Sequence, residues 1–388
     1  MRFLFAFVAG NGHFAPLVPI AQSTIDAGHD VLFAAQPKMV PIVEAAGFEI
    51  MPTSRTSRFV TDDNPRKPLL PPSAEREDDT LRTRFAGTYA ASRAADIIAI
   101  SANWNPDLIV CDELDFGAML AAEHLNIPHV TVLVIASGSM IRVSVISEPL
   151  NERRAEIGLS PDPDLAMLYG SLTISPFPPS YRDPAHPLPP NTHSIRPSVI
   201  DANDDIVPAW IADLEDRPTI YFTLGTIFNL ESGDLFNRVL SGLRDLDANI
   251  VMTVGRDIDP AEFGPQPSNI HIERYTPQSI LMPYVDLVIS HGGSGTVMGA
   301  LAYGLPQIVI PLAADQLMNA ARVVNLGLGR SLDPITLSSQ QIRDTTTSLL
   351  TDQPTHTAAQ RIRDEIANLP PATSAIPRIE SLVLSVHS

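Results

Sequence analysis

A glycine-rich turn in the second half of the chain has the residue types that bind an anion. The turn consists of His291, Gly292, Gly293, Ser294, Gly295 and Thr296. It follows the apolar run 286–290, a predicted buried strand, and we expect a helix to begin at Thr296. The first N–H groups of a helix have no partner within the helix, and glycines let a bulky anion approach them. The sequence therefore predicts that a phosphate group binds at this turn.

Common nucleotide-binding motifs do not explain the turn. Its glycines do not have the GxGxxG spacing, and the sequence contains no GxxxxGK(S/T) loop. NAD and ATP are therefore disfavoured as ligands. Glycine-rich turns between strands and helices also serve packing alone, so a purely structural role stays open at this point.

A histidine near the N-terminus is a candidate general base. His13 follows Gly10, Asn11 and Gly12, just after the predicted strand Phe3–Ala9. Open α/β sheets bind ligands at the carboxyl ends of their strands, and an imidazole can accept a proton near neutral pH. His13 could therefore take the proton of an attacking hydroxyl group. The other interpretation is a histidine that caps the following helix or faces solvent.

Composition narrows the class of protein. The 388 residues are 44% apolar, enough for two domains, and the formal net charge is -18. Such an acidic chain is not expected to bind nucleic acid or an anionic membrane, because it lacks a basic stripe. An anionic ligand must therefore be bound by local groups and not by the net charge. Cys111, the only cysteine, lies in a predicted strand and is expected to be buried. No apolar run reaches the roughly 18 residues of a membrane span, and we expect a soluble, cytoplasmic protein without stable membrane insertion.

Alternating apolar runs and helical patterns predict an α/β fold with two Rossmann-like, doubly wound parallel-sheet domains. The predicted strands are 3–9, 30–35, 108–111 and 129–133 in the first half and 219–223, 249–253, 270–273, 287–290 and 307–311 in the second. Residues 52–80 follow neither period and are predicted to form a long loop. Proline-rich sequence places a hinge between Pro184 and Pro208. We expect domains at 1–200 and 201–374, with a C-terminal helix, 375–388, that could cross back to the first domain.

Five motifs follow one another along the chain: Gly10–His13, Thr223–Thr226, Arg274–Gln278, His291–Thr296 and Pro311–Ala320. Together they resemble those of GT-B fold glycosyltransferases of family 1, which include bacterial antibiotic and macrolide glycosyltransferases and UDP-glycosyltransferases. The resemblance implies a C-terminal domain that binds a nucleotide sugar and an N-terminal domain that binds the acceptor, facing each other across a cleft. It also implies an inverting transfer of a hexose or deoxyhexose with no metal ion and no cofactor, the nucleotide-diphosphate sugar being the co-substrate.

The resemblance assigns roles to individual residues. His13 would be the general base, and Asp112, at the end of the strand 108–111, the carboxylate that orients it. Asp112 could instead cap the next helix, and Glu113 or Asp115 could supply the carboxylate. The implied donor-binding residues are Thr223, Gly225, Thr226, Tyr275, Pro277, Gln278, His291, Gly292, Gly293, Ser294, Gly295, Thr296, Asp315, Gln316 and Asn319. Of these, Asp315 and Gln316 match residues that bind sugar hydroxyls, although they could equally cap a helix.

The donor and the acceptor are defined only by class. Tyr275 stands where plant enzymes usually carry Trp, which favours the bacterial branch and a TDP-sugar, with a UDP-sugar as the other candidate. Asn11, Met140 and Ile141 are candidates to contact a small hydrophobic acceptor such as a natural-product aglycone, although Met140 and Ile141 could be plain core. The alternative functions are a non-catalytic helper of a glycosyltransferase and a GT-B nucleotide-sugar epimerase. The oligomeric state, monomer or homodimer, stays open.

Overall fold

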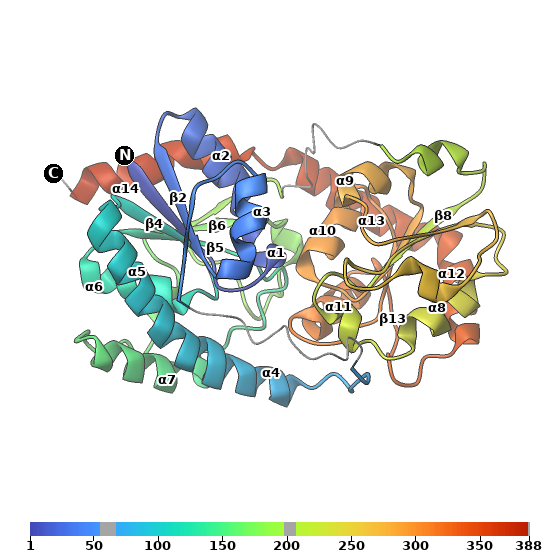
Figure 1. Ribbon diagram of the computed structural model, residues 1–388, viewed down its shortest axis with the longest axis horizontal. Helices are drawn as coiled ribbons and strands as arrows, with labels where there is room; N and C mark the ends of the chain where they lie inside the picture. The colour runs from blue at the N-terminus through green and yellow to red at the C-terminus, as the bar shows by residue number, and fades with distance from the viewer. Residues whose placement is uncertain (55–66, 198–206, 387–388) are drawn as a thin grey trace. The chain divides into compact units, whose positions relative to one another are not determined.

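The computed structural model describes residues 1–54, 67–197 and 207–386. These residues form two compact units (Figure 1). Unit 1 contains residues 1–54, 74–197 and 369–386, and unit 2 contains residues 67–73 and 207–368. The expected boundary at 200 lies outside the described residues. The chain returns to unit 1 at Leu369, a few residues before the expected position.

Unit 1 is built on a seven-stranded parallel sheet with the order β3-β2-β1-β4-β5-β6-β7. Its strands are β1 (Arg2–Ala6), β2 (Asp30–Ala35), β3 (Ile50–Pro52), β4 (Leu108–Asp112), β5 (His129–Val132), β6 (Leu172–Ser175) and β7 (Thr192–Ser194). Because β1 pairs with both β2 and β4, the strand order reverses at this pair. Sheets of this kind bind ligands beyond the carboxyl ends of the strands at the reversal. His13 and Asp112 follow β1 and end β4, at that edge.

Helices cover both faces of this sheet. Leu4 and Ala6 of β1 belong to one apolar cluster, whereas the alternate residues Phe3 and Phe5 belong to a second cluster. Cys111 is buried in the first cluster, as expected. The helices of unit 1 are α1 (Asn11–Phe14), α2 (Val18–Asp26), α3 (Val40–Ala45), α4 (Ala74–Thr80), the π-helix η2 (Leu81–Tyr89), α5 (Ala90–Trp104), α6 (Phe116–Leu125), α7 (Val143–Glu156) and α14 (Ile376–Val386), with the 3-10 turns η1 (Pro37–Met39), η3 (Ala166–Leu168), η4 (Pro179–Tyr181) and η9 (Ala372–Ala375).

The C-terminal segment completes unit 1. Ile376, Ile379 and Val383 of α14 are buried in the second apolar cluster, the one that contains Phe3. His29 Nε2 lies 2.8 Å from Glu380 Oε1, so a polar contact also joins α14 to the loop before β2. The segment that we expected to cross back therefore packs on the unit that the N-terminus begins.

Unit 2 repeats the design with a six-stranded parallel sheet of order β10-β9-β8-β11-β12-β13. Its strands are β8 (Thr219–Thr223), β9 (Asn249–Thr253), β10 (Ile270–Glu273), β11 (Leu287–Ser290), β12 (Gln307–Val309) and β13 (Gly329–Ser331). Its helices are α8 (Leu235–Leu243), α9 (Gln278–Leu281), α10 (Ser294–Ala302), α11 (Gln316–Asn325), α12 (Ser339–Leu350) and α13 (Gln353–Asn368), with the 3-10 turns η5 (Ala209–Asp213), η6 (Phe228–Glu231), η7 (Pro260–Phe263) and η8 (Met282–Tyr284). No helix in the described ranges is long and apolar enough to cross a membrane.

Several elements differ from the expectations. The predicted loop 52–80 is wrong over residues 74–80, where α4 begins one continuous helix with η2 and α5. β1 ends at Ala6 instead of Ala9, because the N–H group of Val8 binds the Asp112 carboxylate. Residues 143–194 contain the helix α7, with Pro149 in its interior, and the strands β6 and β7, none of which the sequence predicted. Part of the predicted hinge, 198–206, lies outside the described residues.

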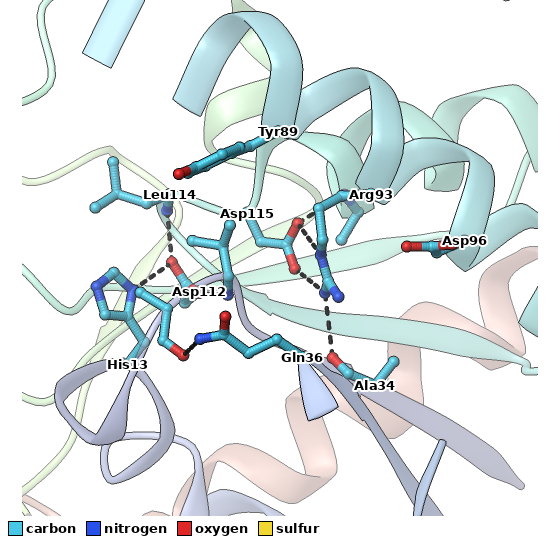
Figure 2. A network of polar contacts seen from close by, with 12 residues as sticks. His13, Ala34, Gln36, Tyr89, Arg93, Asp96, Asp112, Leu114 and Asp115 are labelled. Atoms are coloured by element: carbon cyan, nitrogen blue, oxygen red, sulfur yellow. Dashed lines mark hydrogen bonds and ion pairs between the residues drawn. The ribbon is translucent and has the colours of Figure 1, made fainter. Parts of the chain in front are cut away.

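A buried ion pair holds three elements together behind the loop that follows β4 (Figure 2). Arg93 of α5 donates from Nε to Asp115 Oδ1 at 3.2 Å, and its Nη2 contacts both Asp115 Oδ2 and the carbonyl oxygen of Ala34 in β2. The side chains of Arg93 and Asp115 are 2% and 0% exposed. Asp115 also accepts the N–H group of Ala118 and so caps α6. The pair therefore fixes α5, α6 and the end of β2 relative to one another.

We expect Arg93→Met to lower the free energy of unfolding by about 3–5 kcal/mol, because it leaves the Asp115 carboxylate buried without its cation. Urea denaturation of the purified variant measures this loss. Arg153→Met is the matched control: Arg153 pairs with the exposed Glu156 on α7, and such surface pairs contribute at most about 1 kcal/mol. Equal stability of the two variants would contradict a structural role for the buried pair.

Candidate active site

The structure pairs His13 with Asp112 (Figure 2). His13 Nδ1 lies 3.2 Å from Asp112 Oδ1. Asp112 is fully buried, and its carboxylate accepts the backbone N–H groups of Val8 at 2.8 Å and Leu114 at 2.7 Å. These donors fix the carboxylate, and a carboxylate beside Nδ1 favours the tautomer that carries its proton there. Nε2 of His13 is then the ring nitrogen that can accept a proton.

The neighbouring acids have other partners. Glu113 Oε1 accepts the backbone N–H groups of Val134 and Ile135, each at 2.5 Å. Asp115 caps α6 and pairs with Arg93, as described above. The helix cap is therefore Asp115 and not Asp112, and the geometry selects Asp112 from the three candidate partners of His13.

Local contacts hold the loop that carries His13. The N–H group of His13 donates to the carbonyl oxygen of Gly10 at 3.0 Å in the short helix α1. Gln36, directly after β2, donates from Nε2 to the carbonyl oxygen of Ala9 at 2.8 Å (Figure 2). The side chain of His13 is 17% exposed, so the ring is held on one side and accessible on the other.

The glycine-rich turn of unit 2 begins a helix, two residues earlier than expected. Gly293 is the N-cap of α10, and the N–H group of Val297 donates to its carbonyl oxygen at 3.0 Å. The N–H groups of Ser294, Gly295 and Thr296 therefore lie in the first turn, where the helix dipole favours an anion. A Cβ atom on Gly295 would meet no atom within 4 Å, so the turn is open at this residue.

His291 is packed against two glycines. A Cβ atom on Gly225 would lie 2.6 Å from His291 Cε1, and one on Gly293 would lie 2.6 Å from His291 Nε2. Both glycines are therefore required for the ring to sit where it does. Burial lowers the pKa of His291 to about 4, and Nδ1 has no hydrogen-bond partner among the described residues. His291 is consequently neutral at physiological pH, and it could serve an anion as a hydrogen-bond donor but not as a cation.

Asp315 and Asn319 tie α11 to the glycine-rich turn. Ser294 Oγ donates to Asp315 Oδ2 at 2.5 Å. Asn319 Nδ2 donates to Asp315 Oδ2 at 2.8 Å, to the carbonyl oxygen of Gly292 at 2.9 Å and to Ser294 Oγ at 3.1 Å. Gln316 is buried, and its Oε1 accepts the N–H groups of Leu312 and Ala313. These side chains thus support the turn and its neighbouring loop, while their predicted contacts with a sugar stay predictions.

The other predicted donor-binding residues differ in their exposure and in their hydrogen-bond partners. Thr223 is buried and accepts a hydrogen bond from Thr253, whereas Thr226 is exposed. Gln278 Nε2 donates to Thr296 Oγ1 at 3.1 Å, which links α9, capped by Pro277, to α10. The ring of Tyr275 is half-exposed beneath the guanidinium group of Arg256, at 5.3 Å. Tyr275 and Thr226 are the accessible members of this set.

The candidate acceptor-binding residues also differ in their exposure. Asn11 is exposed in α1, beside His13. Met140 is buried in the first apolar cluster of unit 1, and Ile141 packs against the same cluster. Their position favours the packing role that the sequence left open, and a direct contact with an acceptor stays a prediction.

Sequence reasoning missed Arg182, whose charge acts on Glu113 in unit 1. Burial raises the pKa of Glu113 to about 7, against the charge of Arg182, which favours the carboxylate. Arg182 follows η4 in the proline-rich segment, where no motif singled it out. No group of three or more His, Cys, Asp and Glu side chains in the described part of the chain has a geometry that could hold a metal ion.

Comparison with known proteins identifies the fold and the family. The structure superimposes on the glycosyltransferase SnogD of Streptomyces nogalater with a TM-score of 0.77 at 26% identity, covering 99% of each chain. Spinosyn rhamnosyltransferase SpnG, solved with thymidine diphosphate, gives a TM-score of 0.80 at 22% identity over 98% of this chain and all of its own. Among sequences, 4'-demethylrebeccamycin synthase of Lentzea aerocolonigenes is 28% identical over 98% of this chain and 99% of its own length. L-demethylnoviosyl transferase of Streptomyces niveus is 29% identical over 95% of both.

Two domain families account for most of the chain. Residues 23–225 match the N-terminal domain described as erythromycin biosynthesis protein CIII-like, and residues 237–382 match the C-terminal domain of the same description. The two parallel sheets, their strand orders and the solved neighbours are those of the GT-B fold. The chain therefore belongs to the erythromycin biosynthesis protein CIII-like family and is a GT-B glycosyltransferase.

Proposed function

We propose that the protein transfers a hexose or deoxyhexose from a TDP-sugar to a hydroxyl group of a small hydrophobic acceptor, such as a natural-product aglycone. The observation that carries the proposal is the contact of His13 Nδ1 with the buried carboxylate of Asp112. This arrangement leaves Nε2 to accept the proton of an attacking hydroxyl group. The names of relatives support the substrate class, since they include a tylactone mycaminosyltransferase of Streptomyces fradiae.

The proposed reaction is a single displacement. The acceptor oxygen forms a bond to C1 of the sugar while its proton passes to Nε2 of His13. The bond between C1 and the diphosphate oxygen breaks, and the nucleoside diphosphate leaves with the electron pair. Attack from the face opposite the leaving group inverts the configuration at C1. Asp112 acts through His13: it orients the ring and stabilises the imidazolium that forms.

We infer that the first turn of α10 holds the leaving diphosphate without a metal ion. The amide groups of Ser294, Gly295 and Thr296 and the helix dipole supply positive potential at this position. Backbone donors that are already in place need no reorganisation as charge develops on the leaving group. Their contribution matters in a chain of net charge -18, whose overall field repels a diphosphate.

The proposed donor carries thymidine. One solved neighbour is described as complexed with thymidine diphosphate and another as in complex with DTDP. In this chain, the half-exposed ring of Tyr275 offers a surface on which a pyrimidine base can stack. A UDP-sugar is the second candidate, because stacking alone does not distinguish thymine from uracil.

We expect TDP to raise the melting temperature of the protein, and UDP to raise it less, because a ligand that binds only the folded state stabilises it. A thermal-shift titration with both nucleotides, in buffer containing EDTA, measures the difference. Equal shifts would remove the preference for thymidine, and no shift with either nucleotide would contradict the proposed donor class.

His13→Ala should lower the rate of transfer from TDP-glucose by about 100-fold or more, because loss of a general base typically costs this much. A panel of tylactone, 10-deoxymethynolide and erythronolide serves as acceptors, and product is measured by mass spectrometry. His124→Ala is the control, since His124 is exposed and contacts the carbonyl oxygen of Ile157. TDP affinity should be unchanged in both variants. A wild-type rate in His13→Ala would remove His13 from the mechanism.

The affinity for TDP-glucose should not change between pH 7 and pH 8.5, because the pKa of His291 is about 4 and its ring is already neutral there. TDP-glucose is a suitable probe, since its diphosphate does not ionise in this range. Calorimetry at several pH values measures the dissociation constant. If His291 bound the diphosphate as a cation, affinity would instead fall as pH rises. His291→Gln should weaken binding about tenfold at every pH, the effect of one hydrogen bond to a charged group.

A further inference from the structure

Tyr221 of β8 buries a hydroxyl group in an otherwise apolar cluster of unit 2. The side chain is 2% exposed, and the same cluster contains Val251, Val288 and Ala300. The apolar packing does not need the oxygen, since phenylalanine would fill nearly the same space. A buried hydroxyl group loses its hydrogen bonds to water, so protein groups must replace them. The hydrogen-bond partners of Tyr221 therefore show what its hydroxyl group does.

The first partners lie at the carboxyl ends of β8 and β9. Tyr221 Oη lies 2.9 Å from Thr253 Oγ1, and Thr253 Oγ1 donates to Thr223 Oγ1 at 2.9 Å. Thr223 and Thr253 are paired in the register of the two strands, and Tyr221 shares a face of β8 with Thr223. Thr223 Oγ1 also accepts the N–H group of Gly225 at 3.2 Å. The hydroxyl groups thus link the cluster to the turn that follows β8.

The turn after β8 packs closely against His291. The φ angle of Gly225 is 74°, in the left-handed region, and a Cβ atom on Gly225 would lie 2.6 Å from His291 Cε1. The hydrogen bond from Gly225 to Thr223 Oγ1 closes this turn onto the end of β8. A contact that supports Thr223 therefore also supports the turn Thr223–Thr226, which the sequence assigns to the donor.

The hydroxyl group of Tyr221 also acts on the second donor motif, residues 274–278. Burial raises the pKa of Tyr221, and hydrogen bonds with the two threonines and with Gln278 oppose the shift. Gln278 begins α9, and its Nε2 donates to Thr296 Oγ1 at 3.1 Å in the first turn of α10. A Cβ atom on Gly299 would lie 3.0 Å from Gln278 Oε1, so the amide group lies against α10. Tyr221 and Gln278 therefore connect β8 with the start of α10.

We propose that Tyr221 is a positioning residue for the nucleotide sugar: its hydroxyl group holds the turn Thr223–Thr226 and Gln278 in the arrangement that binds the diphosphate. The inference rests on the proposed function, since it assigns both segments to the donor of that reaction. Because Tyr221 is buried, it acts through its protein partners and does not touch the donor. Without this hydroxyl group, ligand binding has to order both segments, and the affinity falls.

Tyr221→Phe removes the hydroxyl group and keeps the ring. The variant should fold, because Thr253 stays bonded to Thr223 and Gln278 stays bonded to Thr296. We expect its dissociation constant for TDP to rise about fivefold, the effect of one neutral hydrogen bond. Calorimetry with the purified wild-type and variant proteins measures this change.

Two control variants separate positioning from a loss of stability. Ile342→Val shortens a buried side chain of α12 that packs against Gly242 of α8, and it should lower the thermal stability without changing TDP affinity. Tyr284→Phe removes the hydroxyl group of a tyrosine that is 47% exposed, and its TDP affinity should equal that of the wild type. If Ile342→Val weakened TDP binding as much as Tyr221→Phe, the effect would be one of stability and the proposal would be wrong.

A double-mutant cycle tests whether the effect passes through Thr253. Thr253→Val should weaken TDP binding, whereas Thr253→Ser keeps the hydroxyl group and should keep the wild-type affinity. The variant with both Tyr221→Phe and Thr253→Val should bind TDP no more weakly than the weaker of the two single variants, because both changes remove the same contact. Fully additive losses would overturn the route through Thr253.

Amide hydrogen exchange of the ligand-free protein tests the inference independently of the reaction. Peptides that cover residues 223–226 and 294–296 should exchange faster in Tyr221→Phe than in the wild type or in Ile342→Val. Unchanged exchange in both segments, or unchanged TDP affinity of the variant when the wild type binds TDP, would overturn the role of Tyr221. If the wild type binds neither TDP nor UDP but the exchange differs as expected, Tyr221 still holds the two segments and the proposed donor class fails.

Discussion

The chemistry of unit 1 depends on how one buried carboxylate is held. Asp112 lies at the end of the central strand β4, where two backbone N–H groups and the ring of His13 approach it from different sides. The backbone donors fix the direction of the carboxylate, because each N–H group points at one of its oxygens. β1 ends before Val8, because the N–H group of Val8 donates to the Asp112 carboxylate instead of continuing the strand. The end of β4, which carries Asp112, therefore sets the orientation of the proposed base.

In unit 2, the positive potential comes from backbone groups and not from charged side chains. The chain has 44 acidic and 26 basic side chains, and the residues around the glycine-rich turn add no cation that faces it in the described contacts. The positive potential comes from the helix end, whose geometry is fixed by Asp315 and Asn319 on α11. Because His291 is kept neutral by burial, the site gains no charge from titration near neutral pH. An acidic protein can in this way present an anion site that is insensitive to moderate changes in pH.

Much of this architecture can be predicted from the sequence, for identifiable reasons. Strands such as Asp30–Ala35 and Thr219–Thr223 have the predicted bounds because each is an apolar run between polar or helical segments. Helix α7 was missed because Pro149 lies inside it, and the proline rule favours a break there. The sequence predicted that His13 and three acidic residues lie at one edge of the sheet. Which of the three acids contacts His13 depends on the direction of each side chain within one turn, and only the structure shows that it is Asp112. Arg182 lies in a loop with no periodicity or motif, so only the fold could show that its charge acts on Glu113.

The return of the C-terminal segment has a consequence for biosynthesis. Residues 369–386 supply part of the apolar interior of unit 1, yet they emerge from the ribosome after all of unit 2. Before these residues are synthesised, the apolar cluster that contains Phe3 is incompletely covered. Until α14 is synthesised, the nascent chain therefore exposes the apolar surface that α14 covers in the folded protein.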